Sequence, residues 1–232
     1  MSAIENITAP KIARQTPLRI YKQEQARISR SSLYKTTAFY TTYAMIVLYF
    51  LLRSAHPLVG LFFYSIGLAT YTLVEYVFHR WVLHMHFADG PGIHKYLHKY
   101  LDPLHFGHHE NPYDGHHING DIENVLPLFF VCAPLSHYLS PIYFLPAILA
   151  GTVQSYIITE WIHHSMHLYN FKNVYFRYAR RHHFYHHSPR GITRGYGVTS
   201  GFWDVPFKTR YPAEVRWALH QRPKELLKRK QG

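Results

Sequence analysis

The sequence predicts an all-α integral membrane protein with about four transmembrane helices and a cytoplasmic helical cap. Three observations predict this class: long uncharged apolar runs, Lys and Arg residues concentrated outside those runs, and histidines clustered where the runs end. The mean hydropathy of −0.19 would suit a soluble protein, but this average hides the segregation of apolar from charged residues. At 232 residues, the chain is expected to form one or at most two domains.

The apolar runs have the lengths of membrane spans. Residues 36–52 carry no charge, and residues 54–74 contain a single histidine as a group that can be charged. Each run fits one spanning helix, which needs about 20 apolar residues. Residues 124–159 are too long for one span, and Ser140-Pro141 interrupts them near the middle. We therefore expect a hairpin of two short spans there.

The distribution of basic residues predicts the topology. The formal net charge is +12, and seven Lys or Arg residues precede the first span. Others lie in the loop 79–123 and from Lys172 to the C-terminus, whereas only Arg53 lies between the first two spans. Short loops rich in Lys and Arg stay on the cytoplasmic side. Both termini and the 79–123 loop are therefore expected in the cytoplasm. Nucleic-acid binding is disfavoured, because it would leave the uncharged runs without a purpose.

The remaining segments follow in order. Residues 1–35 form a polar, basic N-terminal arm, without an apolar core and cleavage site that would indicate a secretory signal. The second span runs on into a histidine-rich helix end, and Asp89–Gly92 reads as a turn. The following segments are a helical stretch interrupted by Pro103, a polar loop at 110–123, the hairpin at 124–159, a basic aromatic helix at 170–187, and a basic C-terminal tail at 211–232.

Half of the twenty histidines fall into four clusters with metal-ligand spacing. The clusters are His79-x4-His84, His105-x2-His108-His109, His163-x3-His167 and His183-x2-His186-His187. Imidazole is the commonest metal ligand in proteins, and ten rings exceed the coordination number of one metal. The clusters therefore predict a site for two metal ions, located in the cytoplasmic cap.

Helical spacing places most rings of a cluster on one side. Residues three and four apart share a helix face, which aligns His163 with His167. His79 and His84 are five apart, or about 140° around a regular α-helix. Either a π-bulge realigns the two rings or they serve different metals, and we favour the second option.

Some histidines have simpler interpretations. His56, His137 and His220 are taken as ordinary surface or core residues. His86, His94 and His98 would suit a position near lipid headgroups, and His116 and His117 could touch substrate. A metal-buffering tract is disfavoured, because such tracts are contiguous and low in complexity, whereas the four clusters are spread over more than 100 residues.

The ligand type narrows the chemistry. An all-imidazole site suits iron, zinc, copper or nickel. Zinc would point to hydrolysis, but no HExxH-type carboxylate is in register. Iron suits oxygen chemistry on an unactivated C–H bond. Glu75 and Glu160 lie near cluster-bearing helix ends. An ion pair with a nearby arginine is one interpretation of each, but we favour a role in accepting the ring N–H that faces away from a metal. The one cysteine, Cys132, excludes an intrachain disulfide and a cysteine-ligated iron–sulfur centre.

Five segments together resemble the fatty acid hydroxylase/sterol desaturase superfamily, and most closely the fatty acid 2-hydroxylase pattern. They are EYVFHRWVLH (75–84), HFGHHENP (105–112), TEWIHHSMH (159–167), HHFYHH (182–187) and GYGVTSGFWDVPFKT (195–209). The stretch IHKYLHKY differs from that pattern and resembles sterol methyl oxidases. His164 and His182 stand where the pattern commonly has tyrosine, and Glu160 stands where it has aspartate.

The resemblance implies a membrane hydroxylase-like domain over residues 36–210. Its metal ligands would be His79, His84, His105, His108, His109, His163, His167, His183, His186 and His187. It implies two iron ions, although zinc could occupy the same site, together with O2 and a lipid acyl substrate. The sequence has no haem domain of the kind fused to some eukaryotic 2-hydroxylases, so a separate electron-transfer protein is expected.

The sequence therefore predicts a diiron monooxygenase that hydroxylates a lipid acyl chain, with no role in nucleic-acid binding. Oxidation or desaturation of a sterol or carotenoid is the alternative within the superfamily. A metal transporter is the alternative from another class. Transporters place their ligands at the bilayer midplane, whereas these histidines collect at the ends of the predicted spans. A metal-dependent hydrolase is a third alternative.

Overall fold

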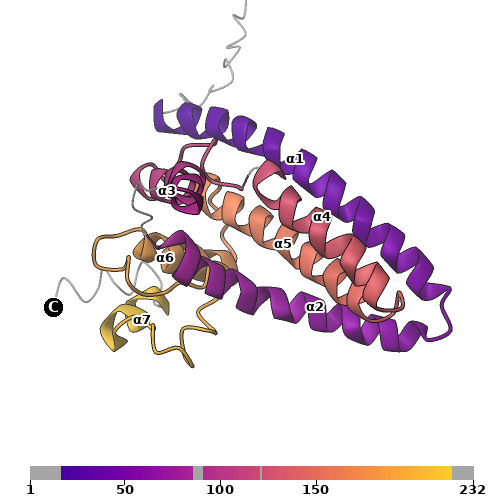
Figure 1. Ribbon diagram of the computed structural model, residues 1–232. Coiled ribbons are helices and arrows are strands. Elements are labelled where there is room, and N and C mark those ends of the chain that lie inside the picture. Colours follow the sequence, from indigo (N-terminus) through magenta and orange to yellow (C-terminus); the bar gives the residue numbers. More distant parts are fainter. Residues whose placement is uncertain (1–16, 86–90, 121, 221–232) are drawn as a thin grey trace, which may run out of the picture.

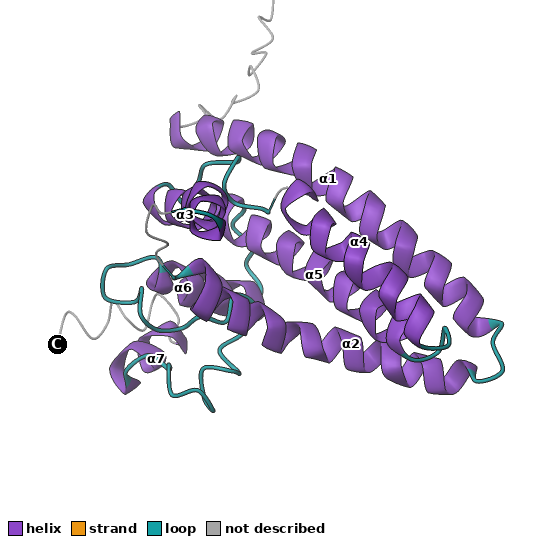
Figure 2. Cartoon of the chain, viewed as in Figure 1, coloured by secondary structure: helices purple, strands orange, loops and turns teal. Residues whose placement is uncertain are grey.

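The computed structural model describes residues 17–85, 91–120 and 122–220, and over these residues it is built of helices joined by loops and turns (Figure 2). This confirms the predicted all-α class. The elements are α1 (Pro17–Leu52), α2 (Pro57–Phe78), a π-helix (His79–Leu83), α3 (Ile93–Glu110), α4 (Ile122–Leu139), α5 (Leu145–Leu168), α6 (Val174–His186) and α7 (Ala213–His220).

Four long helices form a bundle, and the shorter ones gather at one of its ends. Helices α1, α2, α4 and α5 run side by side, with α3, α6 and α7 at the end away from the α1–α2 turn (Figure 1). Buried side chains from α1, α4 and α5 make the main core of the bundle: Tyr40, Phe129, Ala133, Val153, Tyr156 and Ile157. The bundle therefore acts as a frame that positions the end carrying α3 and α6.

Helices α2 and α5 approach each other closely through two glycines. A Cβ atom at Gly67 would lie 2.0 Å from the carbonyl oxygen of Ile148. A Cβ atom at Gly151 would lie 2.0 Å from the carbonyl oxygen of Tyr64. Small residues allow helix backbones to approach in this way. The contact fixes the relative positions of two helices that both carry clustered histidines at their C-terminal ends.

The helix boundaries match the predicted apolar runs with two differences. The break at Ser140-Pro141 is confirmed, because α4 ends at Leu139 and α5 begins at Leu145. Helix α1 begins at Pro17, so the described part of the predicted N-terminal arm is helical and continuous with the first run. Helix α3 continues through Pro103 without ending there.

By length and composition, one helical stretch of the described residues, Pro57–Leu83, could cross a membrane. Val125–Leu139 is a shorter apolar helix. Large apolar side chains cover the outside of the bundle, among them Met45, Phe50, Leu58, Phe62, Leu128 and Phe130. Exposed apolar side chains in this number indicate a surface that contacts a membrane or another protein.

Candidate metal centre

The end of α2 changes its winding between the first two histidines. Residues His79–Leu83 form a π-helix, in which the amide of His84 donates to the carbonyl of His79 at 3.2 Å. The wider i→i+5 turn places residues five apart one above the other. The rings of His79 and His84 consequently lie 4.9 Å apart between centroids. Our expectation that these two residues serve different metals is therefore wrong, and the π-bulge is the correct alternative.

The structure brings all ten clustered histidines together in two groups of five. The His79 group consists of His79, His84, His105, His109 and His186. The His163 group consists of His108, His163, His167, His183 and His187. Within each group, one nitrogen from every ring lies within 4.8 Å of those from the other rings. The groups adjoin, because the rings of His109 and His187 stack with centroids 4.3 Å apart.

Helices α3 and α6 each contribute to both groups. On α3, His105 and His109 are four apart and face the His79 group, whereas His108 faces the His163 group. On α6, His186 faces the His79 group, and His183 belongs to the other group. Helices α3 and α6 thus lie between the two groups and contribute histidines to both. Which group each histidine joins depends on how these helices pack, so it could not be predicted from the spacing of the histidines in the sequence.

The nitrogens of the His163 group are too crowded to be explained by hydrogen bonds. Nε2 of His163 lies 3.1 Å from Nε2 of His108, 3.1 Å from that of His167 and 2.9 Å from that of His183. A neutral imidazole nitrogen is either one donor or one acceptor, so it cannot satisfy three such neighbours. Nitrogens bound to a metal at about 2.1 Å would be about 3.0 Å apart when at right angles. The donor set therefore fits a metal ion.

Burial keeps these rings neutral. Loss of hydration, followed by repulsion from nearby imidazoles, lowers the pKa of His109 to about 3 and that of His187 to about 2. The same causes hold the pKa values of His105, His108 and His183 well below the usual range. At pH 7 the rings therefore have a free lone pair, which is the form that binds a metal.

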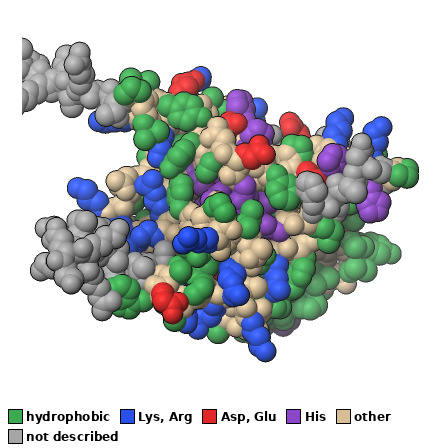
Figure 3. Space-filling model, turned by 90° about the vertical axis from the view of Figure 1, so that its left-hand side faces the viewer, with side chains coloured by type: hydrophobic (Ala, Val, Ile, Leu, Met, Phe, Trp, Pro, Cys, Tyr) green, Lys and Arg blue, Asp and Glu red, His purple; other side chains and the backbone are tan. Residues whose placement is uncertain are grey.

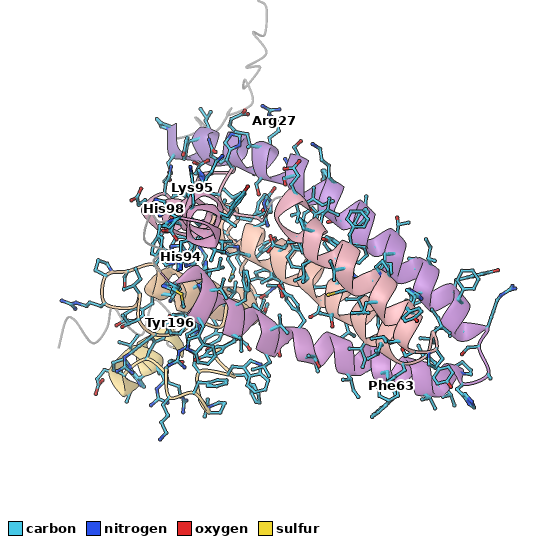
Figure 4. The ribbon with its side chains drawn as sticks, in the orientation of Figure 1. Arg27, Phe63, His94, Lys95, His98 and Tyr196 are labelled. Atoms are coloured by element: carbon cyan, nitrogen blue, oxygen red, sulfur yellow. The ribbon has the colours of Figure 1, made fainter. Side chains whose placement is uncertain are left out.

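Two rings of the His79 group are oriented by backbone carbonyls. Nδ1 of His79 donates to the carbonyl of Tyr196, and Nδ1 of His186 donates to that of Arg194 at 2.8 Å. With Nδ1 protonated, Nε2 carries the lone pair. Buried Asp204 holds this segment by accepting from the amide of Tyr196 at 3.0 Å. Figure 4 shows Tyr196 beside the end of α2, from which the π-helix continues.

The two glutamates bond not to the rings of the grouped histidines, as we expected, but to the segments that surround them. The carboxylate of Glu75 accepts from the amide of Val198 at 2.6 Å and from Oγ1 of Thr199 at 3.2 Å. The carboxylate of Glu160 accepts from Nδ2 of Asn119 at 2.8 Å and from the amide of Gly120 at 3.2 Å.

The ring N–H groups of His79 and His186 donate to backbone carbonyls instead of to these glutamates. Every residue has a backbone carbonyl, so the sequence could not show that those of Tyr196 and Arg194 are the acceptors. Both residues nevertheless lie in or beside the GYGVTSGFWD motif.

The other histidines in the described segments lie outside both groups. Nδ1 of His164 contacts Oγ of Ser29 at 2.8 Å, and Nε2 of His182 is 3.8 Å from Asp204. His98 and His117 pair with Asp102 and Asp114. His86 lies outside the described residues. Figure 3 looks onto the end of the molecule with α3 and α6, where histidine atoms show between Lys and Arg side chains.

Comparison with known proteins gives relatives of one kind. No family model matches the chain. It is 31% identical over 154 residues to a dihydroceramide fatty acyl 2-hydroxylase of Arabidopsis thaliana, covering 66% of this chain and 62% of that protein. It is 32% identical over 162 residues to a ceramide very long chain fatty acid hydroxylase of Schizosaccharomyces pombe, covering 66% of this chain and 44% of that protein. The chain thus spans roughly half the length of these relatives.

A solved structure has a similar fold. The structure of full-length scs7p, in which only the hydroxylase domain is visible, superposes with a TM-score of 0.67 at 26% identity. The match covers 78% of this chain and 67% of that one. Sequence and fold therefore agree with the motifs: the chain is similar to proteins named as fatty acyl and ceramide fatty acid hydroxylases.

Proposed function

We propose that this chain is a membrane-bound, non-haem diiron monooxygenase that hydroxylates a lipid acyl chain, with 2-hydroxylation of a fatty acid or sphingolipid as its reaction. The observation that carries the proposal is the pair of five-imidazole groups at the end of an apolar helical bundle. The relatives named as fatty acyl and ceramide hydroxylases support the choice of substrate class.

The ten grouped histidines would hold one iron ion in each group. The Nε2 separations of 2.8 to 3.1 Å in the His163 group suit ligands at right angles around a five- or six-coordinate metal. A tetrahedral zinc with bonds of the same length would hold its ligands about 3.4 Å apart. The spacing therefore favours a five- or six-coordinate metal. Imidazoles bind zinc as well as iron, and we propose iron because zinc has no redox chemistry with which to insert oxygen.

Bound iron would supply the redox chemistry that places one atom of O2 into a C–H bond. The overall reaction consumes the C–H substrate, O2, two electrons and two protons, and yields the alcohol and water. The chain's own contribution is to hold neutral imidazoles in place and to keep water from the centre, since His167 and His186 are fully buried. Electrons would come from a separate electron-transfer protein, because a single cysteine cannot hold an iron–sulfur cluster.

We further propose that α1, α2, α4 and α5 cross the membrane as four spans, with the histidine groups in a cap on the cytoplasmic side. The exposed apolar side chains of the bundle and the basic residues beyond its histidine-bearing end support this placement. An acyl chain could then reach the centre from the bilayer.

Oxygen isotope labelling tests the reaction. A host that lacks acyl hydroxylation should accumulate 2-hydroxylated acyl chains when it expresses this protein, and growth under ¹⁸O2 should label the new hydroxyl group. The matched control is His163→Ala, which should abolish the product because it removes a ring from the crowded centre of one group. Lipid mass spectrometry measures both.

Three results would contradict the proposal. Label arriving from water would indicate hydrolytic chemistry. Oxidised sterol or carotenoid with unchanged acyl chains would indicate the alternative substrate class. Metal accumulation in the host without any lipid product would indicate transport.

A further inference from the structure

We propose that Ser29 and Asn119 are positioning residues for the metal of the His163 group, acting through Glu160 and His164. They hold the C-terminal turns of α5 on a face that adjoins the one carrying the metal ligands. This inference rests on the dimetal centre of the proposed function and goes beyond it by assigning a role to α1 and to the 111–120 loop.

A buried chain of hydrogen bonds joins three segments that are distant in sequence. Oγ of Ser29 on α1 lies 2.5 Å from Oδ1 of Asn119 and 2.8 Å from Nδ1 of His164 on α5. Nδ2 of Asn119 donates to both the carbonyl oxygen and the carboxylate of Glu160, at 3.1 and 2.8 Å. Ser29 and His164 are fully buried, and Asn119 is 3% exposed. Buried polar groups that bond in this way fix one arrangement of the surrounding elements.

The donors and acceptors of these hydrogen bonds allow only one placement of the hydrogen atoms. A serine hydroxyl has a single hydrogen, and Oδ1 of Asn119 can only accept it. Nδ1 of His164 must therefore carry the proton that is shared with Ser29. Each of the three side chains is used in a defined direction, so loss of Ser29 leaves an acceptor on Asn119 and a donor on His164 without that partner.

The hydrogen bonds among Ser29, Asn119, Glu160 and His164 fix the rotation of α5 about its own axis. His163 and His167 are four residues apart and face the metal group, while Glu160 and His164 are four residues apart on an adjoining face. Trp161 adds a further link to α1, because its Nε1 donates to Oγ1 of Thr37 at 2.9 Å. A rotation of α5 that moved the two ligand rings would break these contacts.

Packing of the 111–120 loop reinforces the same arrangement. Ala26, Ile118 and Leu168 form a small buried cluster between α1, the loop and the end of α5. The side chain of Gln25 accepts from the amide of Gly115 at 2.8 Å. In Figure 4, Arg27 lies on the outer side of this part of α1, away from the loop. The inner face of α1 thus clamps the loop against α5.

The two metal groups have separate supports. The His79 group is oriented by the carbonyls of Tyr196 and Arg194 in the C-terminal segment. The hydrogen bonds around Ser29 involve neither Tyr196 nor Arg194. A substitution that breaks these bonds should therefore release the metal of the His163 group and leave the metal of the His79 group.

Metal content of the purified full-length chain tests this inference. The wild-type protein, reloaded anaerobically with ferrous iron in detergent, should hold about two ions. Ser29→Ala and Asn119→Ala should each lower this to about one, with unchanged helix content by circular dichroism. His164→Asn keeps an N–H at the same number of bonds from Cα and should retain more metal than His164→Leu. The control Ser136→Ala removes a buried hydroxyl on α4 and should hold about two.

Double variants identify which ion is lost. Ser29→Ala combined with His163→Ala should still hold about one ion, because both changes empty the same group. Ser29→Ala combined with His186→Ala should hold almost none. Two ions in Ser29→Ala would overturn the positioning role while leaving the proposed dimetal enzyme intact. Equal loss of both ions, or identical metal content in the two double variants, would show a general structural role and would overturn it as well. Absence of metal from the wild-type chain would instead contradict the proposed function itself.

Discussion

In two of the grouped histidines, a hydrogen bond from one ring nitrogen decides that the other nitrogen is free to bind a metal. For His79 and His186, the acceptor is a backbone carbonyl of the C-terminal segment. Glu75 then anchors that segment to α2 through Val198 and Thr199. The Glu75 carboxylate thus acts on His79 indirectly, through the segment that carries the Tyr196 carbonyl.

Removal of a ligand should empty its own group and no other. We expect His163→Ala and His186→Ala to reduce the metal content from about two ions per chain to about one, because ten imidazoles supply two coordination spheres. His56→Ala, which changes an exposed residue at the opposite end of α2, should leave both ions. Inductively coupled plasma mass spectrometry measures the ratio. A full complement of metal in both ligand variants would refute the assignment of these groups.

Glu75→Gln should weaken the His79 group without removing a ligand. The neutral amide binds the Val198 amide and the Thr199 hydroxyl less strongly, so the Tyr196 carbonyl is less firmly placed. Direct partners of metal ligands contribute 10- to 100-fold to metal affinity. Because Glu75 acts through the segment that carries Tyr196, we expect a loss at the lower end of this range, about 10-fold, in competition with a chelator. Glu110→Gln, at an exposed position of α3, is the matched control. An unchanged affinity in Glu75→Gln would show that the anchor is dispensable.

At the scale of elements, the spacing of histidines predicted which rings align within a single helix, but not how the helices pack around the two groups. The pairing of His163 with His167 follows from a four-residue repeat and agrees with the structure. The separation of His108 from His105 and His109 does not follow, because it depends on how α3 enters between the two groups. For the winding between His79 and His84, the sequence allowed either a π-turn or a regular α-helix, and the structure has the π-helix.

The π-helix should tolerate a deletion better than an insertion. Deletion of Val82 would leave His79 and His84 four residues apart, which keeps them on one face of a regular α-helix. Insertion of an alanine after Val82 would separate the histidines by six residues and turn one ring away. We expect about two ions in the deletion variant and about one in the insertion variant. Equal metal loss in both would mean that alignment of these two rings is not the purpose of the π-turn.

At the scale of the whole molecule, the apolar runs and the break at Ser140-Pro141 were sufficient to predict the four-helix frame. The sequence could not show how closely α2 and α5 approach, because that depends on Gly67 and Gly151 meeting carbonyls across the interface. It also did not indicate that α1 extends from Pro17 to support the loop at 111–120.

The proposed topology predicts which residues can be labelled from each side of the membrane. In a Cys132→Ser background, Glu110→Cys should react with an impermeant maleimide from the cytoplasmic side. Arg53→Cys, in the turn between α1 and α2, should react only from the opposite side. Gel-shift labelling of sealed vesicles distinguishes the two. Labelling of both positions from the same side would contradict four spans.

The central claim is that ten histidines hold two metal ions side by side, and anomalous diffraction tests it most directly. Crystals of the full chain loaded with ferrous iron, measured on both sides of the iron absorption edge, should give two anomalous peaks. One peak should lie among the nitrogens of the His79 group and the other among those of the His163 group. A single peak, or peaks away from these rings, would contradict the account.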